Sequence, residues 1–288
     1  MWKALSDEVT AALGRPYLLQ DRQPISGGDT HRAYCLTDGQ LRLFAKVAPV
    51  EHGEILASEA FGLAELAKTG QVRVPEVVTQ GQTEAFSYLV LEYLPLGQPE
   101  KGAWQKLGEL LAALHGRTDQ AMYGFDEDNF IGLTDQRNGW HKHWDQFFAE
   151  QRLGYQLTLL AEKGERLGDI EELVACAKNL LHGHQPRPAL LHGDLWSGNV
   201  GFLGTEPVLF DPACYYGDRE ADIAMTELFG RLDPDFYDAY DNNLPLDADY
   251  ELRRSLYNLY HLLNHANLFG GHYLQQAKAQ LKQVLAFC

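Results

Sequence analysis

The sequence has no run of apolar residues approaching the roughly 20 that a membrane-spanning helix requires. Its opening residues, Met1 to Glu8, lack the apolar core of a secretory signal peptide. It also lacks internal repeats, low-complexity tracts and a long linker. These absences favour a globular protein of the cytoplasm.

Basic residues are scarce relative to acidic ones. The chain of 288 residues has 24 lysines and arginines against 40 aspartates and glutamates, which gives a formal net charge of −16. A chain this acidic is unsuited to binding nucleic acid or an anionic membrane over a broad face. A small phosphorylated ligand is still compatible, because a few cationic side chains can be concentrated in one cleft.

Cysteine is also rare, and its spacing shows no pairing. The four cysteines are Cys35, Cys176, Cys214 and Cys288. We therefore expect unpaired thiols in a reducing compartment and no structural metal site.

The most informative feature is a short polar segment between two strand-like apolar runs. Residues 192–199 read HGDLWSGN, and residues 211–213 read DPA. Kinase-like phosphotransferases use an Asp with an Asn five residues later, followed by a second Asp after a short strand. This spacing predicts that Asp194 meets the acceptor hydroxyl, while the oxygen ligands Asn199 and Asp211 hold Mg²⁺. The alternative, that both segments are ordinary polar turns, does not explain the combined spacing.

The N-terminal part can supply the matching nucleotide site. Residues 41–47 alternate as a strand does and carry Lys46 among apolar neighbours, the context of a lysine that reaches nucleotide phosphates. Residues 54–68 have helical apolar spacing, and Glu59 on that helix is the predicted partner of Lys46, with Glu54 as a rival. Taken alone, Lys46 and Glu59 also fit an exposed strand lysine and a solvated helix charge.

Two further segments complete the predicted nucleotide site. Ser26, Gly27 and Gly28 lie in a hairpin whose backbone N–H groups could cover phosphates, although plain turns look alike. The strand at 86–92 runs into a turn, so Glu92, Tyr93 and Leu94 are the predicted hinge for the nucleotide base. No side chain there selects ATP over GTP, and the role of Asp29 stays open.

The C-terminal part offers three candidate contacts for the acceptor. They are Trp196, whose flat face suits stacking, Asn129 and His265. Each has an alternative: Trp196 as a core wedge, Asn129 as a turn residue, and His265 as part of a packing helix. In kinase-like folds an Asp at the position of Asp222 can hold the backbone of the Asp194 loop, and a plain charge at the start of a helix is the alternative.

The motifs together resemble the fructosamine-3-kinase, or ketosamine-3-kinase, family. The matching segments span nearly the whole chain: 26–28, 45–47, 68–75, 107–115, 123–132, 192–199 and 216–225. The resemblance implies an α+β, two-lobed protein-kinase-like fold, with a small β-rich N-lobe at 1–95 that binds the nucleotide. A larger, mainly helical C-lobe at 96–288 would carry the catalytic loop, the metal ligands and the acceptor site.

The resemblance also implies an activity: ATP and Mg²⁺-dependent phosphorylation of the 3-hydroxyl of a sugar joined to an amine, with a role in deglycation. Some relatives carry a cysteine in the glycine loop, and this chain does not, so a thiol switch there is not implied. Two alternatives remain: the same fold with another acceptor, such as an aminoglycoside, choline or a free sugar, and a nucleotide-binding pseudokinase. The sequence leaves the sugar, the small-molecule or protein amine carrier, and the oligomeric state undetermined.

Overall fold

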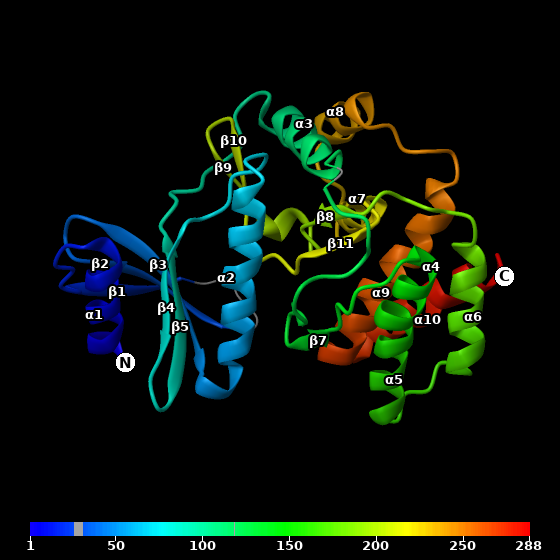
Figure 1. Cartoon of the computed structure of the whole chain (residues 1–288), viewed down its shortest axis with the longest axis horizontal. Helices are drawn as coiled ribbons and strands as arrows, with labels where there is room; N and C mark the ends of the chain where they lie inside the picture. Colours follow the sequence, from blue (N-terminus) through cyan, green and yellow to red (C-terminus); the bar gives the residue numbers. More distant parts are fainter. Residues whose placement is uncertain (26–30, 118) are drawn as a thin grey trace. The chain divides into compact units, whose positions relative to one another are not determined.

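The chain folds into two compact units in a computed structural model that describes residues 1–25, 31–117 and 119–288 (Figure 1). The first unit comprises residues 1–103 and 200–212, and the second comprises residues 104–199 and 213–288. Within the described residues, no helix is both long and apolar enough to cross a membrane.

The first unit is built on a five-stranded antiparallel sheet with the strand order β1-β2-β3-β5-β4. Its sheet elements are β1 (Asp21–Ile25), β2 (Arg32–Thr37), β3 (Arg42–Pro49), β4 (Val77–Gln82) and β5 (Phe86–Glu92). The helices are α1 (Trp2–Leu13), η1 (Val50–His52) and α2 (Gly53–Lys68). The hairpin of β9 (Val200–Leu203) and β10 (Glu206–Leu209) completes the unit.

The alternation along β3 separates a packing face from a functional face. Leu43, Ala45 and Val47 lie in a buried apolar cluster with Leu5 and Val9 of α1. Because successive strand side chains point to opposite faces, Lys46 is directed to the other face, where α2 packs. Figure 1 shows α1 and α2 on opposite sides of this sheet. One face of the strand thus packs in the core, while Lys46 lies on the opposite face.

The β9–β10 hairpin belongs to the sheet unit, although it lies far beyond the expected boundary near residue 95. The Gly97 N–H donates to the Phe202 carbonyl at 2.9 Å, and the Leu209 N–H donates to the Arg73 carbonyl at 2.9 Å. These backbone bonds tie residues 200–212 to the sheet unit, whereas the motifs alone placed everything from residue 96 onwards in one helical part. Asp211 is therefore carried by the same unit as Lys46.

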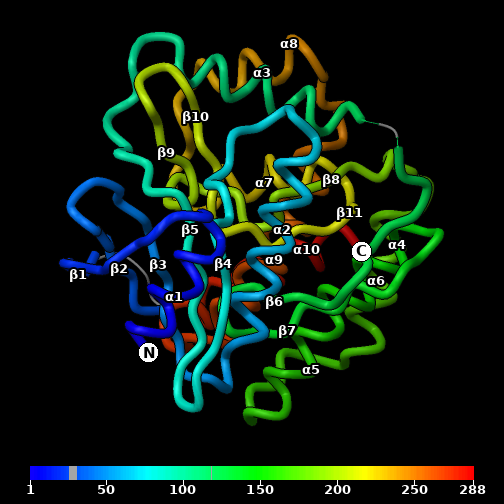
Figure 2. The backbone as a smooth tube through the Cα atoms, turned by 60° about the vertical axis from the view of Figure 1, so that its left-hand side comes forward, coloured from blue at the N-terminus to red at the C-terminus, as the bar shows by residue number. Residues whose placement is uncertain are grey.

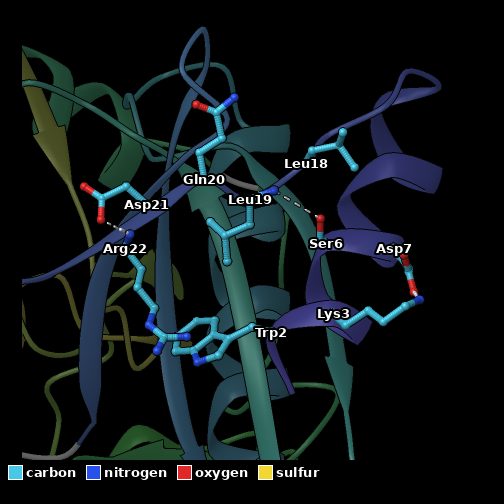
Figure 3. Close-up of a pocket in the computed structure, with 9 residues that line it drawn as sticks. All are labelled: Trp2, Lys3, Ser6, Asp7, Leu18, Leu19, Gln20, Asp21 and Arg22. Atoms are coloured by element: carbon cyan, nitrogen blue, oxygen red, sulfur yellow. Dashed lines mark hydrogen bonds and ion pairs between the residues drawn. The ribbon is translucent and has the colours of Figure 1, made fainter.

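A surface pocket of about 550 Å³ lies beside α1 (Figure 3). Its rim carries the Lys3–Asp7 ion pair at 2.8 Å, and the Arg22 guanidinium lies 4.8 Å from the centre of the Trp2 ring. Both members of the Lys3–Asp7 pair are exposed, and such pairs contribute little to stability or specificity. We assign no function to this pocket.

The second unit is mainly helical. Its helices are α3 (Ala103–His115), α4 (Trp144–Gln146), the π-helix η2 (Phe147–Gly154), α5 (Tyr155–Glu162), α6 (Ile170–Leu180), η3 (Ser197–Asn199), α7 (Glu220–Leu228), α8 (Pro234–Asn243), α9 (Tyr250–Phe269) and α10 (Gly271–Leu285). Two short antiparallel pairs join β6 (Asn129–Ile131) to β7 (Thr134–Gln136), and β8 (Ala189–Leu191) to β11 (Tyr215–Gly217).

Helix α9 is the centre of this unit, since buried residues occur along most of its length. It ends at Gly270, where Gly270 and Gly271 both have positive φ (61° and 48°), a conformation that glycine adopts at no steric cost. The chain therefore reverses sharply, and α10 packs back along α9 (Figure 2).

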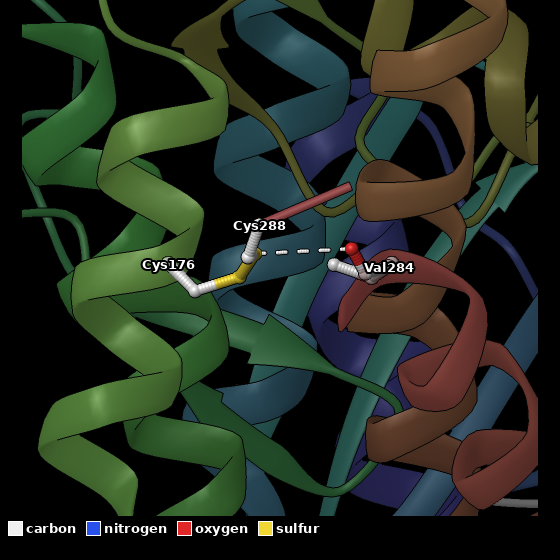
Figure 4. Close-up of a disulfide and its surroundings, with 3 residues drawn as sticks. All are labelled: Cys176, Val284 and Cys288. Carbon is white, nitrogen blue, oxygen red and sulfur yellow. Dashed lines mark hydrogen bonds between the residues drawn. A yellow bond between two sulfur atoms is a disulfide. The ribbon is translucent and has the colours of Figure 1, made fainter. Parts of the chain in front are cut away.

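Helix α6 is linked covalently to Cys288, which lies three residues beyond the end of α10. Cys176 and Cys288 form a disulfide with a Cα–Cα distance of 5.7 Å (Figure 4), within the usual range for such bonds. This pairing contradicts the expectation of unpaired cysteines. The bond closes a loop of 112 residues, a separation that local spacing rules do not detect. Within the described part of the chain, Cys35 and Cys214 are not disulfide-bonded.

We expect Cys288→Ser to lower the free energy of unfolding by about 2–4 kcal/mol under oxidising conditions, because the disulfide restricts the unfolded chain. Denaturant titration with and without a reductant measures this difference. The wild-type protein and Cys35→Ser should both lose stability on reduction, whereas Cys288→Ser should not respond. A wild-type protein insensitive to reductant would contradict this stabilising role.

Candidate functional site

Lys46 lies between two carboxylates in the first unit. Its Nζ is 2.8 Å from both Glu59 carboxylate oxygens and 2.5 Å from Oδ1 of Asp211. Lys46 and Glu59 are buried, with 8% and 7% of their surfaces exposed. The partner on α2 is thus Glu59 rather than the rival Glu54, because Glu59 lies on the buried face of that helix.

The contacts in this cluster shift the pKa values of its ionisable groups. Burial alone would lower the pKa of Lys46, but the adjacent Glu59 and Asp211 carboxylates outweigh it, so the pKa is raised and the ammonium is retained. Burial raises the pKa of Glu59; Lys46 opposes this and Asp211 adds to it. The side chain of Asp211 is 47% exposed, so one of its carboxylate oxygens could also bind a further cation, such as Mg²⁺.

Asp211 has an unusual backbone. Its φ of 56° makes it the single non-glycine with positive φ among the described residues. Such conformations are costly for residues with a side chain and tend to persist at functional sites. Here the conformation accompanies the contact of the carboxylate with Lys46.

The lysine opens onto a cavity of about 330 Å³ within the same unit. Its walls are apolar over much of their area, and the predicted hinge residues Glu92, Tyr93 and Leu94 contribute to them. The Glu92 carboxylate is anchored by Arg73, whose Nη2 lies 2.6 Å from both oxygens. The cavity therefore combines apolar walls with charged side chains, among them Lys46 and Asp211. The predicted glycine loop, Ser26, Gly27 and Gly28, lies outside the described residues.

His31 lines this cavity and was not singled out from the sequence. Burial, and then the charge of Lys46, lower its pKa to about 4, so the imidazole is neutral near pH 7. The sequence offered one indication of this role, which is that His31 directly follows the predicted glycine loop.

The Asp194 loop in the second unit is closed by internal hydrogen bonds. Nδ2 of Asn199 donates to the Asp194 carbonyl at 2.8 Å and to Oδ2 of Asp194 at 3.2 Å. Since the amide nitrogen is engaged in this way, the amide oxygen of Asn199 is the atom oriented for a metal ligand. Gly193 has φ 82°, and a Cβ there would lie 2.0 Å from the Ala213 carbonyl oxygen, so the loop requires glycine.

Asp222 on α7 holds the start of this loop. Its carboxylate accepts hydrogen bonds from the backbone N–H groups of His192 at 2.7 Å and Gly193 at 2.9 Å. His115 lies 3.3 Å from the same carboxylate. Burial would raise the pKa of Asp222, but His115 and these donors reverse the shift and lower it. The carboxylate is therefore a charged, buried anchor for the Asp194 loop.

The three candidate acceptor residues have different environments. Trp196 is partly exposed, and its ring lies over Gly198, where an added Cβ would be 2.3 Å from the ring. His265 is also partly exposed. Asn129 is buried: its Nδ2 donates to the Cys214 carbonyl at 2.7 Å, and its Oδ1 accepts from Gln136.

Asn129 is therefore an internal brace for the β6–β7 pair and is not retained as an acceptor contact. The correction has a simple cause. Its partners come from segments distant in the sequence, so the turn-like context could not indicate them.

A second polar cluster in this unit combines His184, Asp218 and Glu220. The Asp218 carboxylate accepts from the N–H of Glu220, the first residue of α7, at 3.1 Å. Both Glu220 oxygens are bonded to Arg253, at 2.6 and 2.8 Å. The cluster is thus an internal ion-pair network, and we assign no metal to it.

Comparison with solved structures places the fold among protein-kinase-like phosphotransferases. A candidate fructosamine-3-kinase from Haemophilus somnus 129PT superimposes with a TM-score of 0.95 at 32% identity, covering 99% of this chain and 98% of that one. Aminoglycoside phosphotransferase APH(4)-Ia, in a ternary complex with AMP-PNP and hygromycin B, gives a TM-score of 0.61 at 16% identity, covering 98% of each chain. The chain thus has the fold of an ATP-dependent phosphotransferase, with a β-sheet N-terminal part and a helical C-terminal part.

Sequence comparison defines the family. The model of the fructosamine kinase family matches residues 1–287. A probable ketoamine kinase of Vibrio parahaemolyticus is 47% identical over 290 residues, covering 100% of both chains. A probable ketoamine kinase of Escherichia coli strain K12 is 41% identical over 286 residues, covering 99% of this chain and 100% of the relative. This chain belongs to the fructosamine kinase family.

Proposed function

We propose that the protein transfers the γ-phosphoryl group of ATP to the 3-hydroxyl of a ketosamine, a sugar joined to an amine through a carbon next to its carbonyl. The observation that carries the proposal is the Asp194 loop, in which Asn199 is bonded to both the carbonyl and the carboxylate of Asp194. This arrangement positions the carboxylate without neutralising it. The family match supports the choice of acceptor.

In this proposal Asp194 receives the proton of the acceptor hydroxyl. The hydroxyl oxygen forms a bond to the γ-phosphorus as the bond to the β–γ bridging oxygen breaks, giving the phosphorylated ketosamine, ADP and a proton. Asp222 acts through the loop backbone rather than on the substrate, so it is a positioning residue. Trp196 and His265 are the proposed acceptor contacts.

The first unit is the proposed nucleotide-binding part, and the second carries the proposed acceptor site. Lys46, steadied by Glu59, binds the phosphates, and backbone groups near Glu92 and Leu94 meet the base. The glycine loop of Ser26, Gly27 and Gly28 is the proposed cover of the phosphates.

Mg²⁺ supplies charge neutralisation on the phosphates when bound, with Asn199 and Asp211 as its proposed ligands. The partly exposed carboxylate of Asp211 supports this choice, because such oxygen atoms suit a hard divalent cation.

The proposed biological role is deglycation in the cytoplasm, acting on a small-molecule or protein-bound ketosamine without nucleic acid or membrane partners. The test is ATP consumption with Mg²⁺ on ribulose-lysine, fructose-lysine, free ribose, choline and an aminoglycoside. Turnover on sugar-lysine adducts alone supports the proposal. Turnover on choline, ribose or the aminoglycoside alone would replace the acceptor, and tight ATP binding without any turnover would favour a pseudokinase.

We expect Lys46→Met to raise the KM for ATP and lower kcat/KM by about 10²-fold or more, because the phosphates lose a buried cation. Steady-state kinetics at varied ATP concentration measures the effect. Lys68→Met is the matched control, since Lys68 lies exposed at the end of α2 and pairs with Glu65 alone in the same helix. Equal kinetics for the two variants would contradict the role of Lys46.

A further inference from the structure

An aromatic surface extends from the catalytic loop across the second unit. We define the aromatic row as Trp196, Phe229, His265, Phe269 and Tyr273. The ring centres of Trp196 and Phe229 are 6.2 Å apart, and Phe229 lies 4.6 Å from His265. Tyr273 then lies 5.0 Å from His265 and 5.8 Å from Phe269. These separations are those of interacting aromatic rings.

Three separate parts of the chain build this row. Phe229 directly follows α7, His265 and Phe269 belong to the last turns of α9, and Tyr273 belongs to the first turn of α10. The reversal at Gly270 and Gly271 brings the α9 and α10 contributions together. The row therefore depends on the tertiary fold and could not be found from one sequence segment.

The row differs in exposure from the aromatic core of the same unit. Phe148, Phe236 and Tyr257 are all 0% exposed. In contrast, Phe229, His265 and Tyr273 are partly exposed, and Phe269 is 52% exposed. Aromatic side chains that pack on one another while leaving faces accessible are typical of binding surfaces.

His265 is held in one orientation within the row. Its Nδ1 lies 2.9 Å from the His261 carbonyl oxygen. Because a carbonyl oxygen can only accept, Nδ1 carries the proton in this contact, and the bond restrains the ring. The ring is thus fixed beside Phe229 and Tyr273 rather than free to rotate.

We propose that the aromatic row is the subsite for the amine carrier of the acceptor, and that it favours carriers with an apolar alkyl or aromatic substituent. This inference rests on the proposed ketosamine kinase function. In a ketosamine, the carbons bearing the reacting hydroxyl and the amine are separated only by the carbonyl carbon. With the hydroxyl at Asp194, the amine therefore lies close to the catalytic loop.

The substituent on the amine must then continue away from Asp194. Trp196 is two residues from Asp194, and the row leads from Trp196 to the exposed ring of Phe269. An apolar substituent that follows this path exchanges water for aromatic contacts, which favours binding by roughly three- to fourfold for each methylene buried. The exposed end at Phe269 lets a longer carrier continue into solvent.

The experiment uses the sugar that the protein accepts, attached in turn to methylamine, butylamine, hexylamine and benzylamine. We expect kcat/KM to rise by about 10–100-fold from the methylamine adduct to the hexylamine adduct, which corresponds to burial of roughly two to four of the additional methylenes. The rise should come mainly from KM, because the substituent contributes binding rather than chemistry. Equal kcat/KM across the series, or a preference for lysine over hexylamine, would overturn the apolar subsite while leaving the kinase function intact.

Variants locate the effect. Phe229→Ala and Tyr273→Ala should each reduce the hexylamine-to-methylamine ratio of kcat/KM to about a third of its wild-type value or less. Phe229→Leu should restore part of that ratio. Phe287→Ala is the control, because Phe287 is 56% exposed and lies outside the row.

Thermal unfolding of each variant separates a lost subsite from a lost fold, and two independent positions keep the test decisive. An unchanged ratio in both well-folded alanine variants would overturn the inference. Phosphorylation of no adduct at all would instead count against the proposed function.

Discussion

Asp194→Asn is expected to lower kcat by about 10²–10⁴-fold, the range over which general acid–base catalysis contributes. Asparagine keeps the size and the hydrogen bond from Asn199, but it cannot take the proton of the acceptor hydroxyl. The substitution removes the negative charge of the side chain while its size and shape stay nearly the same. Steady-state turnover at saturating ATP and acceptor measures this effect.

The variant should still bind nucleotide, because Lys46 and the residues proposed to meet the base belong to the other unit. Calorimetric titration with a non-hydrolysable ATP analogue tests that separation. Asp126→Asn serves as the matched control, since Asp126 is exposed in the same unit. If Asp194→Asn turned over at the wild-type rate, Asp194 would not be the residue that accepts the proton of the acceptor hydroxyl.

The contacts that the sequence could predict are those set by local periodicity. The alternation of residues 41–47 places Lys46 on the face of β3 opposite Ala45, and helical spacing places Glu59 on the buried side of α2. Their meeting then follows from packing a helix on a sheet. The position of Asp222 near the start of a helix fits a plain helix-terminal charge equally, and its role as a brace was predicted from the resemblance to kinase-like folds.

The features that escaped prediction depend on contacts between distant segments. Asn129 looked like a turn residue because its partner at Cys214 lies 85 positions away. The disulfide of Cys176 and Cys288 closes 112 residues, and no local pattern marks it. The β9–β10 hairpin, which precedes Asp211, is joined to the sheet unit by backbone hydrogen bonds. Every residue type except proline can donate such bonds, so the side chains in the sequence do not indicate them.

Asp222→Ala is expected to lower the free energy of unfolding by about 3–5 kcal/mol, because it removes a buried carboxylate and leaves two buried backbone donors without their acceptor. His192 N–H and Gly193 N–H would lose their acceptor, and His115 would lose its carboxylate. Urea denaturation measures the loss. Asp238→Ala on α8 is the exposed control and should change stability by about 0.5 kcal/mol or less.

The same carboxylate predicts a pH dependence with a definite sign. Its pKa is lowered in the folded protein relative to the ordinary value of 3.8. A lowered folded pKa stabilises the protein above the unfolded pKa, and that contribution disappears as the pH falls through the folded value. The stability gap between the wild type and Asp222→Ala should therefore be constant from pH 6 to 8 and shrink below about pH 4. A gap that instead widened on acidification would show that Asp222 is protonated in the folded protein, and that the loop is held by a neutral acid rather than by a charged anchor.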